Sequence, residues 1–309
     1  MLYTVTLNPA VDRELTVPAI EFDSVLRAIA CQVDFGGKGF NVSRVLKSLG
    51  AASVALGFAG GKSGELLRDG LNSLGIETDF VWINGETRTN VSIVSAAQKR
   101  YVKANEPGPT ISASEQAALL QKIRGLAKKG DWWVLAGSLP PGVPDSIYAE
   151  ITTSVQAGGG RVLLDTSGDA LQYGCQAGPY LVKPNAFEAH KLTGLPVDTL
   201  PQIIASAAAI QGLGATCVVI SLGKDGAMLY EDRKAWIGHS PHIEERNPIG
   251  AGDSMVGGLV WGLQAGLDLA EALRWGIACG AATASLSGTA VGDRNLVETL
   301  LAQVQIEPA

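Results

Sequence analysis

The stretch WWVLAGSLPPGVPDSIYAEITTSVQAGGGRVLL, residues 132–164, contains the pattern that decides the fold. Trp132 to Ala136 and Arg161 to Leu164 are short apolar runs, each followed by glycine or aspartate, which is typical of buried β-strands. Between them, residues 146–157 carry apolar side chains at spacings of three and four, which predicts a helix. A strand, a helix and a second strand in this order favour a parallel sheet with helices packed on it.

The same alternation continues on both sides of this stretch. Further strands are predicted at Tyr3 to Leu7, Ser53 to Phe58, Tyr180 to Val182 and Thr216 to Ser221. Further helices are predicted at 40–49, 63–74, 113–128, 200–212, 252–265 and 268–286. The pattern favours an α/β fold with helices on both faces of a mainly parallel sheet and a ligand beyond the carboxyl ends of the strands. Because no repeat or low-complexity tract interrupts it, we expect a single domain over residues 1–309.

Two segments, 13–33 and 90–103, break the alternation. The second, NVSIVSAAQKRYVK, alternates around a polar SAAQK stretch as a hairpin does. We interpret the two as a small β-sheet lid built from residues at about 12–34 and 88–104. Two surface excursions without function are the alternative that the pattern leaves open.

Composition and charge argue against several classes of partner. Of 309 residues, 46% are apolar and 17% charged, and 24 basic residues are interspersed among 30 acidic ones for a net charge of -6. Because no basic stripe follows from this pattern, we expect neither a nucleic-acid nor a membrane partner. The four cysteines form no C-x-x-C pair and the first residues lack the features of a signal peptide, which favours the cytoplasm.

The glycine-rich turn NPIGAGDS, residues 247–254, gives the strongest indication of chemistry. It leads into an apolar helical run, so free backbone N–H groups, the positive end of a helix dipole and the carboxylate of Asp253 should meet at one point. Amides of Ala251, Gly252 and Asp253 could hold developing negative charge while Asp253 accepts a proton. An ordinary helix cap at Asp253 is the alternative.

A second glycine cluster, GGKGFN at residues 36–41, also precedes a helix. It places Lys38 and Asn41 beside exposed amides and suits the hydroxyls of a sugar. A tight turn and helix cap is an equally open interpretation.

Both clusters belong to a set of motifs that resembles the PfkB carbohydrate kinases. The quoted segments, in chain order, are GGKGFNVSRVLKSLG (36–50), ETRTNV (86–91), GSLPPG (137–142), LVKPNAFE (181–188), VVISLGKDGA (218–227) and NPIGAGDSMVGGL (247–259). The resemblance spans nearly the whole chain and implies a ribokinase-like fold, a three-layer αβα sandwich with a small β-sheet lid.

The resemblance also implies roles for individual residues. For catalysis it implies a base, Asp253, and an anion-holding turn, Gly250, Ala251 and Gly252. For the sugar it implies Asp12, Gly36, Gly37, Lys38 and Asn41, and for the phosphate already on the sugar Arg88, Ser138 and, from a neighbouring lid, Arg27. For the nucleotide it implies Lys183, Asn185, Ser221 and Gly223, with Glu188 acting on Mg²⁺ largely through water. A solvated helix residue is the alternative for Glu188.

The motifs look most like the hexose-phosphate branch of the family. This implies phosphorylation of a ketohexose monophosphate by ATP with Mg²⁺, fructose 1-phosphate being the first expectation and tagatose 6-phosphate or fructose 6-phosphate the alternatives. A sugar-phosphate sensor without turnover is the alternative from another class, and a ribose or nucleoside kinase is disfavoured by Arg88 and Lys38. An exposed lid sheet needs its edge covered, so we expect a homodimer formed through the lid.

Overall fold

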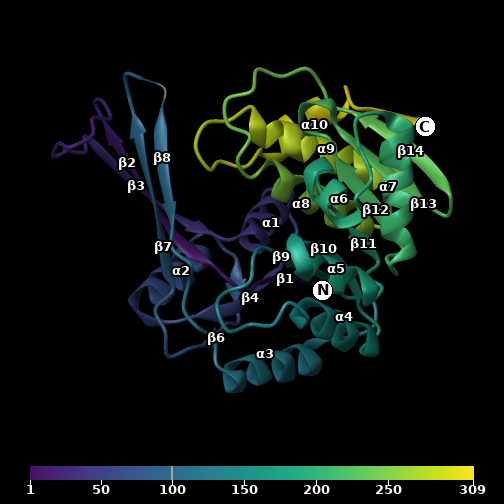
Figure 1. Ribbon diagram of the computed structural model, residues 1–309, viewed down its shortest axis with the longest axis horizontal. Helices are drawn as coiled ribbons and strands as arrows, with labels where there is room; N and C mark the ends of the chain where they lie inside the picture. Colours follow the sequence, from purple (N-terminus) through teal and green to yellow (C-terminus); the bar gives the residue numbers. More distant parts are fainter. Residues whose placement is uncertain (99) are drawn as a thin grey trace.

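The computed structural model describes residues 1–98 and 100–309 and divides their strands between two sheets (Figure 1). In the larger sheet the order is β15-β14-β13-β12-β11-β10-β9-β1-β4-β5, with β6 paired to β4. Its strands are β1 (Leu2–Thr6), β4 (Val54–Ala59), β5 (Glu77–Thr78), β6 (Val81–Trp82), β9 (Trp132–Ala136), β10 (Arg161–Asp165), β11 (Leu181–Val182), β12 (Cys217–Ser221), β13 (Ala227–Glu231), β14 (Lys234–His239) and β15 (Gln305–Pro308). Pairs from β12 through β1 to β4 are parallel, so their carboxyl ends meet at one edge.

Helices cover both faces of this sheet because its strands are apolar on both sides. In β9, Trp133 and Leu135 belong to one core cluster, whereas Trp132 and Val134 belong to the other. The first cluster includes residues of α3 (Ala113–Leu126), α4 (Ile147–Ala157), α5 (Gly168–Gln176), α6 (Ala186–Thr193) and α7 (Leu200–Gly212). The second includes residues of α1 (Lys38–Ser48), α8 (Ala251–Gln264), α9 (Leu269–Ala284) and α10 (Arg294–Leu301). The predicted three-layer αβα arrangement is confirmed.

The smaller sheet stands beside this body and holds four strands in the order β3-β2-β7-β8 (Figure 1). They are β2 (Ala10–Val17), β3 (Ala30–Gly36), β7 (Arg88–Ser95) and β8 (Tyr101–Asn105). Helix α2 (Gly61–Ser73) packs near its base through Leu67 and Leu71, which share a cluster with Val11. The two segments that break the sequence alternation therefore form one separate sheet; Lys99, in the predicted hairpin, lies outside the described residues.

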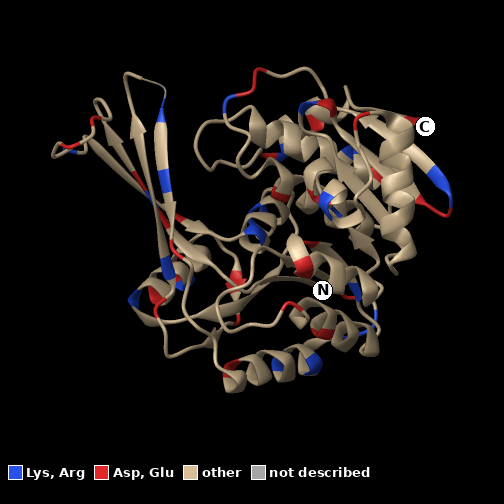
Figure 2. Ribbon diagram, viewed as in Figure 1, with Lys and Arg blue, Asp and Glu red and all other residues tan. Residues whose placement is uncertain are grey.

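Elements that the sequence pattern missed are short or carry weak signals. The hairpin β13–β14 turns through Asp232 and Arg233, both with positive φ, where glycine or asparagine would have marked the turn. Helices α5, α6 and α10 are only two to three turns long and lack a long apolar stripe. Within the described ranges, no helix is long and apolar enough to cross a bilayer. Acidic and basic residues are interspersed over the ribbon (Figure 2).

Candidate active site

Asp253 lies in the first turn of α8, at the edge where the parallel strands end. The helix starts after Gly250, whose φ of 83° favours glycine, and no side chain caps it, so the alternative of Asp253 as the helix cap is wrong. Of the three amides predicted to hold an anion, that of Ala251 donates to the Pro248 carbonyl at 3.2 Å. The amides of Gly252 and Asp253 have no acceptor among the described residues, as expected for a first helical turn.

The carboxylate of Asp253 is buried, with 8% of the residue exposed. Asn41 Nδ2 donates to its Oδ2 at 2.7 Å. Burial, followed by repulsion from Asp165, raises the pKa of Asp253 to about 6, against the attraction of Lys38, the Asn41 hydrogen bond and the attraction of Lys183. Asp253 is therefore mainly ionised at neutral pH and is a stronger base than an ordinary aspartate.

Two lysines pair with a buried carboxylate, Asp165, that the sequence reading did not single out. Asp165 ends β10 and is 1% exposed, and the ammonium groups of Lys38 and Lys183 each lie 3.4 Å from its Oδ1. Burial alone lowers the pKa of Lys38, but attraction to Asp165, Asp253 and Glu188 outweighs this and the pKa is raised. Lys38 therefore stays charged beside the start of α8.

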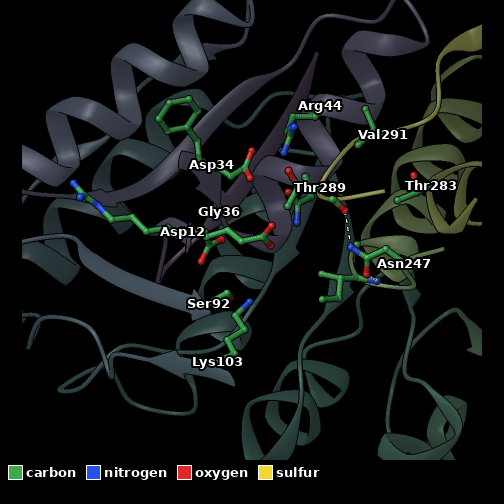
Figure 3. A pocket seen from close by; sticks show the side chains of 17 residues that line it. Asp12, Asp34, Gly36, Arg44, Ser92, Lys103, Asn247, Thr283, Thr289 and Val291 are labelled. Atoms are coloured by element: carbon green, nitrogen blue, oxygen red, sulfur yellow. Dashed lines mark hydrogen bonds between the residues drawn. The ribbon is translucent and has the colours of Figure 1, made fainter. Parts of the chain in front are cut away.

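A cavity next to this group lies between the small sheet, α1 and the loops that precede α8 and follow α9 (Figure 3). Its charged lining residues are Asp12, Arg13, Glu14, Asp34, Arg44 and Lys103. Asn41 and Gly250 also line it, so the hydrogen bond from Asn41 joins the cavity to Asp253. The loop before α8 is tied down by Asn247, whose Nδ2 donates to the Gly288 carbonyl at 2.6 Å.

Asp12 is held in this cavity by its neighbours in the small sheet. Asn90 Nδ2 donates to its Oδ1 at 2.7 Å, and a Cβ on Gly36 would lie 2.0 Å from its Oδ2. A side chain on Gly36 would therefore displace the carboxylate of Asp12. Gly37 has a φ of 146° at the start of α1, which turns the chain from the small sheet toward Lys38.

The three predicted contacts to the sugar's phosphate are not brought together. Arg88 donates to the backbone carbonyls of Asn8, Pro9 and Glu106, so much of its guanidinium is engaged within the protein. Ser138 is exposed in the turn after β9. Arg27 is exposed in the loop between β2 and β3. This loop lies at the far end of the small sheet (Figure 1). In a single chain this loop does not line the cavity.

The predicted nucleotide residues do lie together, at the carboxyl ends of β11 and β12. Ser221 forms an isolated parallel bridge with Asn185, and Gly223 adopts a φ of 62° in the following turn. Asn185 Oδ1 accepts from the Glu188 N–H, and Glu188 Oε2 accepts from the Asn185 N–H, which makes a capping box for α6. A purely structural role for Glu188 at the start of α6, the alternative to a role at Mg²⁺, therefore accounts for one of its two carboxylate oxygens.

With this geometry in place, comparison with known proteins decides the family. The family described as pfkB family carbohydrate kinase matches residues 5–295. The chain belongs to the pfkB family of carbohydrate kinases. The kinase is 36% identical to 1-phosphofructokinase of Bacillus subtilis (strain 168) over 306 residues, 99% of each chain. It is 34% identical to 1-phosphofructokinase of Borreliella burgdorferi over 308 residues, 99% of this chain and 98% of the relative.

Solved structures give the same result. The phosphofructokinase-2 from Escherichia coli in complex with potassium has a TM-score of 0.93 and 30% identity, and covers 97% of this kinase and 98% of that chain. The resemblance to the family and its ribokinase-like fold, predicted from the motifs, are confirmed.

Two site residues of the kinase were missed although the sequence carries a signal for each. Asp165 directly follows the predicted strand 161–164, at the edge where ligands are expected. Asn90 lies inside the quoted ETRTNV motif. The sequence does not say that Asp165 will meet two ammonium groups or that Asn90 will meet a carboxylate, because these partners come from other elements.

Proposed function

We propose that this kinase transfers the γ-phosphate of ATP to a hydroxyl of fructose 1-phosphate, giving fructose 1,6-bisphosphate and ADP. The observation that carries the proposal is Asn41, which lines the cavity of Asp12 and donates to Asp253 beside free helix amides. The names of the two relatives above favour fructose 1-phosphate as the sugar.

In this mechanism Asp253 accepts the proton of the attacking hydroxyl. The hydroxyl oxygen bonds to the γ-phosphorus, the bond to the bridging oxygen of ADP breaks, and ADP leaves with its electron pair. We assign the proton to Oδ1, which accepts no hydrogen bond among the described residues, whereas Oδ2 accepts from Asn41. Amides of Gly252 and Asp253 stabilise the charge on the transferring group, as positioned dipoles do in phosphoryl transfer.

The proposed Mg²⁺ fits the donors at this edge. Mg²⁺ prefers oxygen ligands and is held by one or two carboxylates together with phosphates and water. Glu188 has one carboxylate oxygen outside its capping box, and no group of three His, Cys, Asp or Glu suited to a metal occurs among the residues described. Glu188, with the nucleotide phosphates, would hold the ion, which supplies charge neutralisation on the phosphates.

We assign the sugar and nucleotide residues by location: Asp12, Gly36, Gly37, Lys38 and Asn41 bind the sugar, and Lys183, Asn185, Ser221 and Gly223 bind the nucleotide. Arg88, Ser138 and Arg27 of the partner subunit keep the role at the sugar's phosphate that the family resemblance implies, although contacts within one chain do not bring them together. The small sheet acts as the lid that excludes water, and it also forms the homodimer.

Release of ADP in the presence of ATP and Mg²⁺ tests the proposal directly. Fructose 1-phosphate, fructose 6-phosphate, tagatose 6-phosphate and ribose are compared by kcat/KM. We expect the highest value for fructose 1-phosphate. A higher value for fructose 6-phosphate would move the assignment to a 6-phosphofructokinase. Binding of a sugar phosphate without ADP release would identify a sensor.

Asp253→Asn tests the base. We expect turnover to fall by about 10² to 10⁴-fold, because general base catalysis contributes about this much, while the affinity for fructose 1-phosphate stays close to that of the native enzyme. Stopped assays at saturating ATP and calorimetry with the sugar phosphate measure the two quantities. Near-native turnover would remove Asp253 from this role.

A further inference from the structure

Asp165 is a buried carboxylate with an unusual pair of neighbours. It lies at the end of β10. Its Oδ1 pairs with the ammonium groups of two lysines, Lys38 in α1 and Lys183, which directly follows β11. Lys183 is 4% exposed. Both contacts measure 3.4 Å, longer than the 2.7–3.2 Å of a good N–H···O hydrogen bond, so each ammonium keeps donors for another acceptor.

Both ammonium groups are held close to the place where phosphate must pass. A Cβ on Gly252, whose amide is free, would lie 3.8 Å from Lys183 Nζ. Lys38 Nζ and Asp253 interact strongly enough for each to shift the pKa of the other. Two ammoniums and two carboxylates balance while Asp253 is ionised. Once Asp253 has accepted a proton, one positive charge is in excess, and it matches the negative charge that develops on the phosphoryl group.

We propose that Asp165 is a positioning residue, whose buried carboxylate holds Lys38 and Lys183 on either side of the start of α8 so that both point at the transferring phosphoryl group. The inference rests on the proposed function. Without Asp165, two like charges in a site of low dielectric would repel each other and turn toward solvent, since no other ion pair among the described residues joins them.

Asp165→Asn keeps the shape and removes the charge. We expect kcat to fall by about 10²-fold, as misplacement by about 1 Å does, and the KM for fructose 1-phosphate to rise by a smaller factor, because Lys38 also binds the sugar. The acidic limb of the pH profile of kcat should also move to lower pH, because Asp165 raises the pKa of Asp253. Lys38→Met should add little to the loss in Asp165→Asn, because the two act as one unit.

Asp131→Asn is the matched control. Asp131 is also buried and paired, with the N-terminal ammonium at 2.9 Å, but it lies at the opposite, amino end of β9. This variant should lose stability and keep its kcat and pH profile. A near-native kcat in Asp165→Asn, a loss with an unmoved acidic limb, or full recovery at high Mg²⁺ would each overturn the inference, the last by making Asp165 a metal ligand.

A readout without turnover separates this inference from the proposed function. Asp165 helps to raise the pKa of Lys38, so Lys38 should be acetylated by acetic anhydride faster in Asp165→Asn than in the native protein, as measured by mass spectrometry. An unchanged rate would overturn the positioning role. If the native protein turns over no sugar phosphate but the rate at Lys38 rises, the proposed function fails and the contact to Asp165 stands.

Discussion

At the scale of single residues, the chemistry depends on which side chain holds which carboxylate. Asn41 holds Asp253 and Asn90 holds Asp12, each at 2.7 Å and each from a different element. The family resemblance marked Asp12, Asn41 and Asp253 for the site, but the pairing of donor with acceptor depends on positions up to 212 residues apart in the chain. A sequence pattern contains the residue types and not these distances. For the same reason, the sequence did not predict Asp165 as part of the site.

The pKa of Asp253 predicts the pH dependence of turnover. Only the ionised carboxylate accepts a proton, so kcat should fall as pH drops through about 6, the raised pKa, and not near 4 as for an ordinary aspartate. Asn41→Ala removes a hydrogen bond that lowers this pKa, so its acidic limb should move to higher pH, opposite to Asp165→Asn. Initial rates at saturating substrates between pH 5 and pH 8 measure both, and a flat profile down to pH 5 would contradict the assignment.

Asn90→Ala tests the support of Asp12. A hydrogen bond to a charged group contributes about 1.5–3 kcal/mol, so we expect the KM for fructose 1-phosphate to rise by about 10-fold or more. The value of kcat should change less, because Asp253 has its own support in Asn41. Asn295→Ala, at an exposed position of α10, is the control. Equal KM values in the two variants would show that Asp12 needs no such support.

At the scale of elements, glycines in α8 set how closely the helices of one layer pack. A Cβ on Gly258 would lie 2.4 Å from the Trp275 carbonyl oxygen in α9, and one on Gly257 would lie 2.7 Å from Val45 in α1. These contacts place the first turn of α8, with Asp253, against α1, with Asn41. The long helices and strands could be predicted from their periodicity, whereas the close approach of α8 to its neighbours could not, because a glycine in a helical pattern does not say what it faces.

Gly258→Ala should lower the free energy of unfolding by about 1–3 kcal/mol, the usual cost of overpacking. Gly125→Ala, in α3, is the matched control: a Cβ there meets nothing within 4 Å, so the free energy of unfolding should rise by up to about 1 kcal/mol from helix propensity alone. Urea denaturation followed by circular dichroism measures both. Equal stability of the two variants would mean that α8 and α9 have room to separate.

At the scale of the whole molecule, the small sheet has two unlike faces. Paired residues on neighbouring strands share a face, and alternate residues along a strand lie on opposite faces. Asp12 is paired with Asp34 and Asn90, on the face that borders the cavity. The other face carries an apolar row of four residues paired across the sheet: Cys31, Leu15, Ile93 and Val102. Val102 is 47% exposed, so within one chain this row is incompletely covered.

We propose a second copy of the chain as the partner for this row, because its own sheet offers the same apolar face and its loop carries Arg27. Ile93→Asp, at the centre of the row, should therefore convert a dimer to a monomer in multi-angle light scattering, since an ionised carboxylate buried in an apolar interface is strongly disfavoured. Ser92→Asp places the same charge on the opposite face of the same strand, so this variant should keep the molecular mass of a dimer.

The same variants test whether Arg27 of the partner subunit completes the phosphate site. If it does, the activity per chain of Ile93→Asp should fall, with a raised KM for fructose 1-phosphate. A native chain that stays monomeric at every concentration would refute the dimer and leave the sugar's phosphate to residues of one chain.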